Sequence, residues 1–415
     1  MQLSLARVGM LLAALVAVAA PARAEVVTLD TTHTLFHESP TRTKMTVYTP
    51  GADLEVVPFE WLKVRAGWEA DIVSGASVAV KAGQAYQNTH PGADVVTAAS
   101  VHDLRNMARG GFTLKKENVE LTGGYAYSTE NDYKSNSFNV AARTDTYEHN
   151  SQFEISYARN FDRVCDRVQA ANDAPPRWRA LEDSSGCFTK SNPLRTTRDI
   201  GVDGFQGTWS QSWTPIFVTQ AVYTAQVNSG FQSSPYRSVI LGEGLKAQEH
   251  EPDNRFRQAL ALRANLFIKP LKAAVRLGIR GYYDTWDIKS GTAEAEFDKY
   301  LGDSFRVMAR GRYYKQSGAL FWSDDYTGGD RPLGPKGQYW TGDRELSPFS
   351  SWLVGLRALY TVRPASGRIF GIMESFKAGV SGDVLFLSYD EYTLGGEPIG
   401  NARAYMLGLT VSAIF

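Results

Sequence analysis

Two stretches joined by Lys269-Pro270 decide the fold: Arg255–Ile268, RFRQALALRANLFI, and Leu271–Asp284, LKAAVRLGIRGYYD. In each of them apolar and polar side chains alternate, so that Leu260 lies on one face and Arg263 on the other. A period of two predicts β-strands with one apolar and one polar face. The short connection predicts that the two strands form an antiparallel hairpin.

The polar faces of this hairpin and of the later stretch Phe305–Lys315 carry arginines. An arginine that faces lipid at the bilayer midplane costs about 2 to 4 kcal/mol. If these strands cross a membrane, the arginines are therefore expected to face a lumen. They are Arg257, Arg263, Arg276, Arg280, Arg306, Arg310 and Arg312. Between them, Glu294, Glu296 and Asp298 predict ion pairs that hold neighbouring strands together, or alternatively a transport site.

Strand length separates a membrane barrel from a soluble β-sandwich, which also alternates. Alternating segments such as Leu62–Asp71, Leu104–Lys115 and Arg255–Ile268 are long. They suit a tilted transmembrane strand of about 9 to 11 residues better than the usual strand of about 5 to 6. The last segment, Tyr405–Phe415, alternates and ends on Phe, which resembles the signal recognised by the assembly machinery of outer-membrane barrels. We therefore predict an all-β, antiparallel up-and-down transmembrane barrel in the bacterial outer membrane, in contact with its lipid.

Counting Val26–His37 and Lys44–Val56 as the first hairpin gives about sixteen strands, an even number as expected for a single-chain barrel. Short and long connections alternate along the chain, which predicts one barrel over residues 25–415 without a domain boundary. The expected long connections, which we assign to the outside, are Ile72–Val101, Val164–Arg198, Gly230–Asn254 and Ser317–Pro348.

The first 24 residues have the features of a secretory signal peptide. Arg7 gives the positive start, Met10–Ala20 the apolar core, and Ala22-Arg23-Ala24 the small-residue cleavage site. No later stretch is apolar for long enough to be a membrane helix. The chain has 44 basic and 44 acidic residues, which gives no support to nucleic-acid binding.

One motif indicates a cofactor. Asp71-Ile72-Val73-Ser74-Gly75-Ala76-Ser77 resembles the target of bacterial flavin transferases, in which the last hydroxyl receives the phosphate of FMN. The resemblance implies that Ser77 anchors covalent FMN and that Asp71, Ser74, Gly75 and Ala76 form the recognition box. The alternative is a loop of small residues beside a strand end.

A second, degenerate box, Asp94–Ser100, has Ala98 where the pattern has Gly, so Ser100 is the weaker candidate. Both boxes are expected in an external loop, or in one folded back into the lumen. The implied partner, a periplasmic flavin transferase, would have to act before the barrel inserts.

Cys165 and Cys187 are the only cysteines, and both lie in one expected loop of an exported chain. This predicts a disulfide that closes the loop, with a redox-active pair as the alternative, although the spacing is not Cys-x-x-Cys. The six histidines are scattered; His33 and His37 share a face but have no cluster of further ligands. We expect no metal site, and without a Gly-x-Ser-x-Gly elbow or a justified His and Ser pair we expect no enzyme.

The early box, its second copy and a barrel-like chain that ends on Phe415 together resemble an uncharacterised domain-of-unknown-function family of bacterial outer-membrane proteins. This resemblance covers the mature chain and implies an architecture but no activity. Two functions remain open. One is a flavin-bearing barrel that transfers electrons at or across the outer membrane. The other is a porin-like passive channel biased towards anions by its lumen arginines, or else a structural barrel.

Overall fold

The computed structural model describes residues 26–39, 44–76, 96–97, 102–168, 187–188, 193–235, 237–241, 245–324, 326, 338–394 and 397–415. The predicted signal peptide lies outside this part of the chain. No helix among the described residues is long and apolar enough to cross a bilayer.

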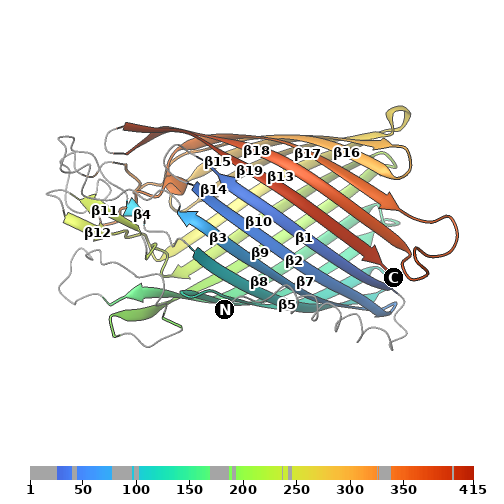
Figure 1. Ribbon diagram of the computed structural model, residues 1–415, viewed down its shortest axis with the longest axis horizontal. Coiled ribbons are helices and arrows are strands. Elements are labelled where there is room, and N and C mark those ends of the chain that lie inside the picture. The colour runs from blue at the N-terminus through green and yellow to red at the C-terminus, as the bar shows by residue number, and fades with distance from the viewer. Residues whose placement is uncertain are drawn as a thin grey trace.

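Sixteen strands form one closed antiparallel barrel in which strands that follow one another in the barrel wall also follow one another along the chain (Figure 1). These strands are β1 (Val26–Glu38), β2 (Lys44–Phe59), β3 (Leu62–Ala76), β5 (His102–Lys116), β6 (Val119–Thr129), β7 (Tyr133–Thr146), β8 (Ser151–Arg167), β9 (Arg195–Thr214), β10 (Phe217–Gly230), β13 (Asn254–Ile268), β14 (Ala273–Asp284), β15 (Lys289–Leu301), β16 (Phe305–Gln316), β17 (Phe349–Val362), β18 (Ser375–Leu394) and β19 (Glu397–Ile414). The predicted fold and strand number are confirmed.

The barrel closes where β1 pairs with β19, from Thr28 opposite Ile414 to Glu38 opposite Ala404. The last residue takes part, because the Phe415 amide donates to the Val27 carbonyl at 2.9 Å. Pairing of the first and last strands leaves no free sheet edge. The chain end that was predicted to be an assembly signal is thus part of the barrel wall.

The outer face carries a band of exposed apolar side chains. Ile279 and Leu356 are 61% and 67% exposed, which is unfavourable in water but expected against lipid. Aromatic side chains border this band on both sides. Phe59 stacks on Trp61 at 5.4 Å towards one end, and Tyr313 lies 4.6 Å from Trp352 towards the other. The closed barrel, the apolar band and the aromatic belts place the protein in the bacterial outer membrane.

One end of the barrel has tight turns and the other has most of the long connections (Figure 1). By the general arrangement of such barrels, the end with short turns is periplasmic and the opposite end is extracellular. One turn differs from its predicted form: Lys269–Leu271 forms the short 3-10 helix η3, closed by Lys272 in a left-handed conformation.

Three predicted loop boundaries also differ. Strand β3 continues to Ala76, so the first six residues of the flavin box are strand and not loop. Strands β8 and β9 likewise extend to Arg167 and back to Arg195, inside the loop expected from Val164 to Arg198. The connection Gly230–Asn254 contains two further strands, β11 (Arg237–Leu241) and β12 (Leu245–Gln248), which pair with each other.

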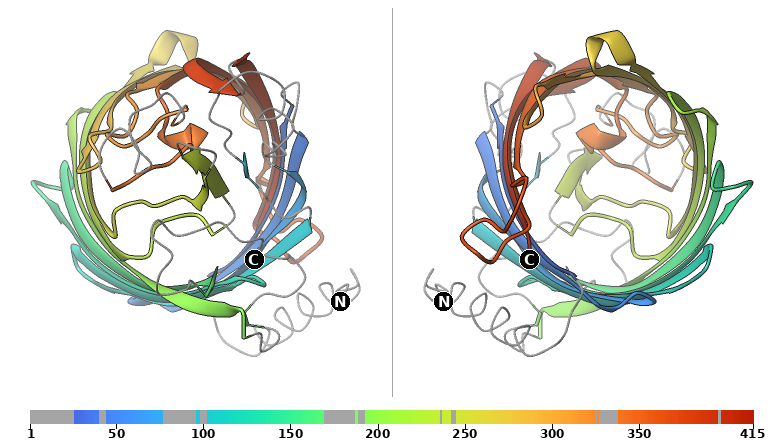
Figure 2. Two further views of the ribbon diagram at one scale, coloured as in Figure 1. Left: turned by 90° about the vertical axis from the view of Figure 1, so that its left-hand side faces the viewer. Right: turned by 90° about the vertical axis from the view of Figure 1, so that its right-hand side faces the viewer.

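These strands belong to a plug at the extracellular mouth. We use this name for residues 231–253 and 317–348 as far as they are described. Strand β11 also pairs with β4 (Val96–Thr97), and the second segment contains the 3-10 helix η4 (Arg344–Leu346). Seen along the barrel axis, these pieces lie inside the ring of strands (Figure 2). The plug therefore narrows the lumen at this end.

Candidate functional site: an arginine-lined lumen beneath a plug

The lumen wall from β13 to β18 carries arginines that are held by carboxylates. Arg263 lies 3.2 Å from Glu294, and Arg276 lies 3.0 Å from Glu296. Asp298, almost fully buried, accepts from Arg276 at 3.1 Å and from Arg306. Each carboxylate accepts charge-assisted hydrogen bonds from an adjacent strand or, for Glu294, from the next strand but one. These pairs therefore hold the wall together. The structural interpretation of the three acidic residues agrees with this geometry.

The opposite wall is built in the same way. Arg105 lies 2.7 Å from Asp71 and 3.2 Å from Glu69, and Arg109 lies 2.5 Å from Asp53. Gly67 stands between Asp53 and Arg109, and a Cβ there would lie only 2.1 Å from the Asp53 carboxylate. A glycine on the middle strand thus lets an ion pair span two strands. In the sequence, Gly67 appeared only as a position without a polar side chain on the otherwise polar face of Leu62–Asp71.

Three of the seven predicted lumen arginines differ from the others in having no ion pair. Among the residues described here, Arg257, Arg280 and Arg312 have no carboxylate within ion-pair distance. The Nε of Arg257 is buried and makes no hydrogen bond to any described residue. The Arg280 guanidinium lies 5.7 Å from the ring of Tyr282. These arginines contribute positive charge that no direct ion pair among the described residues neutralises.

A groove of about 460 Å³ runs along the inner wall over β7 to β14, and two of the arginines without an ion pair line it. In the described part of the chain, Arg257 and Arg280 are the only charged side chains that line it. The rest of the lumen-facing lining is uncharged, and it includes the polar side chains of Ser156, Thr224 and Gln226. The groove is therefore a positive and hydrogen-bonding surface.

A second cavity, of about 530 Å³, lies above the groove and beneath the plug. Arg257, Arg280 and Tyr282 line both cavities, so the two adjoin at these side chains. The upper cavity also contains Asp162 and the plug carboxylates Glu251 and Asp343. Its charge is mixed, unlike that of the groove.

The two plug segments pack on each other. Trp340 is buried with Val239 and Leu241 of β11, and its indole nitrogen donates to the Gln248 carbonyl at 2.8 Å. His250 and Trp340 exchange main-chain hydrogen bonds of 3.0 and 2.9 Å. An apolar cluster with satisfied backbone groups makes the plug a small folded unit.

Buried carboxylates lie inside this unit. Glu249 Oε1 accepts from the Thr341 hydroxyl at 3.0 Å and from the Gly342 amide at 3.2 Å, whereas Oε2 has no partner among the described residues. Burial raises the pKa of Glu249 to about 7, although the nearby Arg237 opposes the shift. Burial, with Glu249 and Asp343 close by, also raises the pKa of Glu251 well above its usual value. The plug thus contains carboxyl groups that retain protons near neutral pH.

Two groups of contacts attach the plug to the barrel. Arg344 of η4 lies 2.9 Å from Glu38 at the end of β1, and both are largely buried. Gln316 of β16 donates to the Ser347 carbonyl at 2.8 Å. Breaking the first contact leaves a buried charge without a partner, which is strongly unfavourable. The plug is therefore held in the mouth by specific polar contacts.

Beneath the plug, Arg255 and Asp284 form a buried ion pair at 2.9 Å, and the Arg255 guanidinium also lies 4.0 Å from the ring of Trp286. Asp284 accepts from the Trp286 and Ile288 amides, which fixes the connection between β14 and β15. Both charged residues stood on the predicted polar faces, but their pairing was not predicted. It depends on the register Arg257 opposite Asp284, which alternation alone does not give.

The flavin box is only partly described. Asp71 faces the lumen on β3, where it accepts from Thr49 at 2.6 Å in addition to its contact with Arg105. The main chain of Ser74, Gly75 and Ala76 pairs with β2. Ser77 and Ser100 lie outside the described residues, so FMN attachment stays a prediction.

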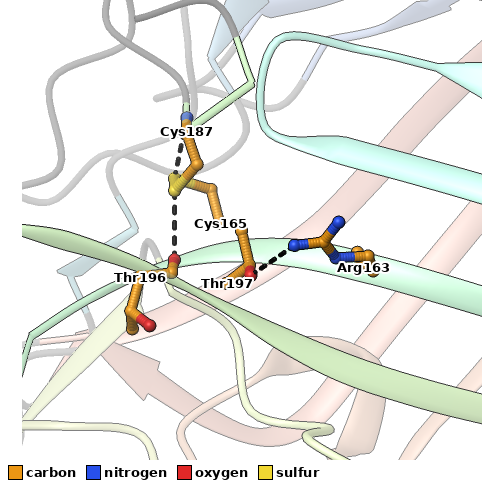
Figure 3. Close-up of a disulfide and its surroundings, with 5 residues drawn as sticks. All are labelled: Arg163, Cys165, Cys187, Thr196 and Thr197. Atoms are coloured by element: carbon orange, nitrogen blue, oxygen red, sulfur yellow. Dashed lines mark hydrogen bonds between the residues drawn. A yellow bond between two sulfur atoms is a disulfide. The ribbon is translucent and has the colours of Figure 1, made fainter. Parts of the chain in front are cut away.

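The predicted disulfide is confirmed. Cys165 and Cys187 are bonded, with their Cα atoms 5.4 Å apart, and the Cys187 amide lies 3.1 Å from Cys165 Sγ (Figure 3). Arg163, two residues before Cys165 on β8, donates to Thr197 of β9 at 2.8 Å. The bond ties residue 187 to the external end of the β8–β9 hairpin.

His33 and His37 hydrogen bond to Tyr48 at 2.7 Å and to Thr46 at 2.9 Å. The part of the chain that the structure describes contains no group of three or more His, Cys, Asp or Glu residues suited to a metal ion. These two histidines therefore link β1 to β2.

The chain is similar to several solved structures. A structure titled "Bacterial polysaccharide outer membrane secretin" is 9% identical, with a TM-score of 0.50, over 94% of this chain and 98% of that one. CdiB from Acinetobacter baumannii is 8% identical, with a TM-score of 0.45, over 93% of this chain and 60% of its own. OccD3 from Pseudomonas aeruginosa is 8% identical, with a TM-score of 0.41, over 95% of this chain and 93% of that one. At such identity the first likeness shows the barrel fold alone.

No curated protein sequence is significantly similar to this chain. The family model described as "Protein of unknown function (DUF3570)" matches residues 2–373. Because this match spans most of the chain, the protein belongs to the DUF3570 family.

Proposed function

We propose that the protein is a passive outer-membrane channel for small anionic solutes. The observation that supports it most is the groove in which Arg257 and Arg280 are the only charged side chains among the described lining residues. A barrel of sixteen strands is compatible with an aqueous lumen. Fixed positive charge in a confined, low-dielectric path concentrates anions and repels cations.

The plug sets the size of the solute. Its segments occupy the extracellular mouth, and a solute has to pass them before it reaches the groove (Figure 2). Because Arg344 and Glu38 join plug to wall, loss of this contact is expected to open the mouth. The channel is therefore a narrow one whose conductance depends on the plug.

The first test is whether the purified barrel conducts in planar bilayers. We expect small, discrete current steps for the wild type and larger or longer steps for Arg344→Gln. The matched control is Arg368→Gln, which breaks an exposed pair with Glu374 in the connection between β17 and β18 and is expected to leave conductance unchanged. Silence of both the wild type and Arg344→Gln would mean a structural barrel.

A second proposal, covalent FMN on Ser77 and electron transfer at the outer membrane, is favoured by the sequence of the box. In the folded barrel the recognition residue Asp71 is engaged by Arg105 and Thr49. A flavin transferase would therefore have to modify the chain in the periplasm before β3 pairs with its neighbours.

Intact mass of the protein from a host that expresses a flavin transferase tests this second proposal. An added FMN mass that is lost in Ser77→Ala and retained in Ser100→Ala would establish a flavoprotein. An unmodified mass under the same conditions would exclude the redox function and leave the channel untouched.

A further inference from the structure

The groove at Arg257 and Arg280 has the composition of a binding site as well as of a channel wall. The Nε of Arg257 is buried without a hydrogen-bond partner in the described structure, although a buried guanidinium N–H is normally satisfied. The terminal nitrogens of the same guanidinium are not buried and have no partner among the described residues, so they can donate to an acceptor brought by a ligand. Guanidinium groups are suited to carboxylates and phosphates, which they bind with two parallel hydrogen bonds.

The two arginines can act on one small ligand. Arg257 stands opposite Asp284 and Arg280 opposite Ala261, so their Cα atoms are offset by four residue pairs, roughly 13 Å along the strands. Tyr282 lies between them on the lumen face of β14, and all three residues line the same groove. Arginine side chains are long enough for both guanidinium groups to reach a ligand of monosaccharide size that lies between the two positions.

The neutral lining indicates what the rest of the ligand carries. Ser156 and Thr224 present hydroxyls to the groove, and Gln226, whose amide nitrogen donates to Asn228 at 2.7 Å, presents a carboxamide. Hydroxyl and amide groups in such a site hydrogen bond to ligand hydroxyls, and the Tyr282 ring offers a face for a sugar. The groove volume of about 460 Å³ is within the range of small-molecule sites.

The groove also indicates what is excluded. Because no carboxylate is among its described lining residues, it has nothing to pair with an ammonium group. An amino acid or a polyamine would bring an unpaired positive charge beside two guanidinium groups. A neutral sugar would offer hydroxyl acceptors but no negative charge to balance the two guanidinium groups.

We infer that this groove is a binding site for a small polyhydroxylated oxyanion, a sugar acid or a sugar phosphate. One of Arg257 and Arg280 binds its anionic group, and the other donates to hydroxyls at the far end of the ligand. This inference rests on the proposed channel function, for which it names the substrate class. A weak site of this kind raises the occupancy of the preferred solute in the lumen.

The test is equilibrium binding to the full-length barrel in detergent at low salt, with gluconate, glucose 6-phosphate, glucose and acetate as probes. Gluconate and glucose 6-phosphate distinguish the carboxylate from the phosphate form of the ligand. We expect one of them to bind at least tenfold more tightly than glucose and acetate. Arg257→Gln and Arg280→Gln should each weaken it about tenfold, as expected for one charge-assisted contact.

The control is Arg403→Gln, because Arg403 is exposed on the outer face of β19 beside Phe386. It should bind like the wild type, and heat-modifiable mobility on gels reports whether each variant is folded. The site would be overturned if neither gluconate nor glucose 6-phosphate bound more tightly than glucose and acetate, or if both folded variants bound like the wild type.

The same protein in planar bilayers separates this inference from the channel. Anion-selective current without binding of either oxyanion would overturn the site and leave the channel standing. Binding without any current would support the site and overturn the channel.

Discussion

Arg310 of β16 donates to Asp383 of β18 at 2.7 Å across the intervening strand β17, directly over Gly355. A Cβ at residue 355 would lie 1.8 Å from the Asp383 carboxylate and 3.1 Å from Arg310 Nε. The same arrangement joins Asp53 to Arg109 over Gly67 on the other side of the lumen. Ion pairs that span two strands thus strengthen both walls of the barrel.

Gly355→Ala is expected to break the Arg310–Asp383 contact, because the added methyl group occupies the position of the carboxylate. The buried carboxylate of Asp383 then loses its partner, which costs about 1 to 3 kcal/mol. Urea unfolding followed by the loss of heat-modifiable mobility measures this change. Gly291→Ala is the control, since a Cβ there meets nothing within 4 Å and alanine suits a strand better than glycine. Equal stability of the two variants would contradict the account.

The plug is expected to be more stable in acid. Burial inside the folded plug raises the pKa of Glu249 from an ordinary 4.5 to about 7, so the folded plug binds the proton more strongly than the unfolded plug. A raised carboxyl pKa stabilises the folded plug fully below about pH 4.5, and this contribution is lost as pH rises through 7. Cleavage by trypsin after Arg237 or Arg344 should therefore be slow at pH 5.5 and faster at pH 8, by up to about tenfold per pH unit for each proton released.

Glu249→Gln separates this effect from the pH dependence of the protease. The variant cannot titrate at this position, so its cleavage profile should be flatter than that of the wild type once both are normalised to an unfolded substrate. Glu374→Gln, which changes an exposed glutamate, should keep the wild-type profile. Identical profiles for Glu249→Gln and the wild type would show that Glu249 does not control the stability of the plug.

Removal of the disulfide should loosen the external end of the β8–β9 hairpin and leave the barrel intact. The bond closes a loop with a sequence separation of 22 and would contribute about 3 kcal/mol in the chain-entropy model. Cys165→Ser with Cys187→Ser should accelerate proteolysis between these residues without changing the heat-modifiable mobility of the barrel. A variant that fails to form the barrel would assign the disulfide a role in the folding of the whole wall.

The barrel itself could be predicted because its physical cause is local. Each strand places a lipid-facing apolar residue at every second position, as with Leu260 and Leu262, so the strands can be recognised from the sequence alone. The last alternating segment was predicted as a strand, whereas the contact of its end, Phe415, with Val27 was not.

The plug could not be predicted in the same way. Its contacts, such as Arg344 with Glu38 and Trp340 with Gln248, join residues far apart in sequence and follow no period. Nor does alternation reveal which lumen arginines are paired, because this depends on the register between strands. Arg276 meets Asp298 whereas Arg280 lies opposite Thr292 on the same neighbouring strand.

The reversal potential of the purified protein in a planar bilayer with a tenfold KCl gradient tests the central claim most directly. We predict that the reversal potential has the sign of an anion-selective channel. It should shift towards zero when Arg257→Gln and Arg280→Gln are combined. Arg263→Gln, which removes an arginine paired with Glu294, should shift the potential less. A cation-selective wild type, or a double variant with unchanged selectivity, would contradict the proposal that unpaired lumen arginines select the solute.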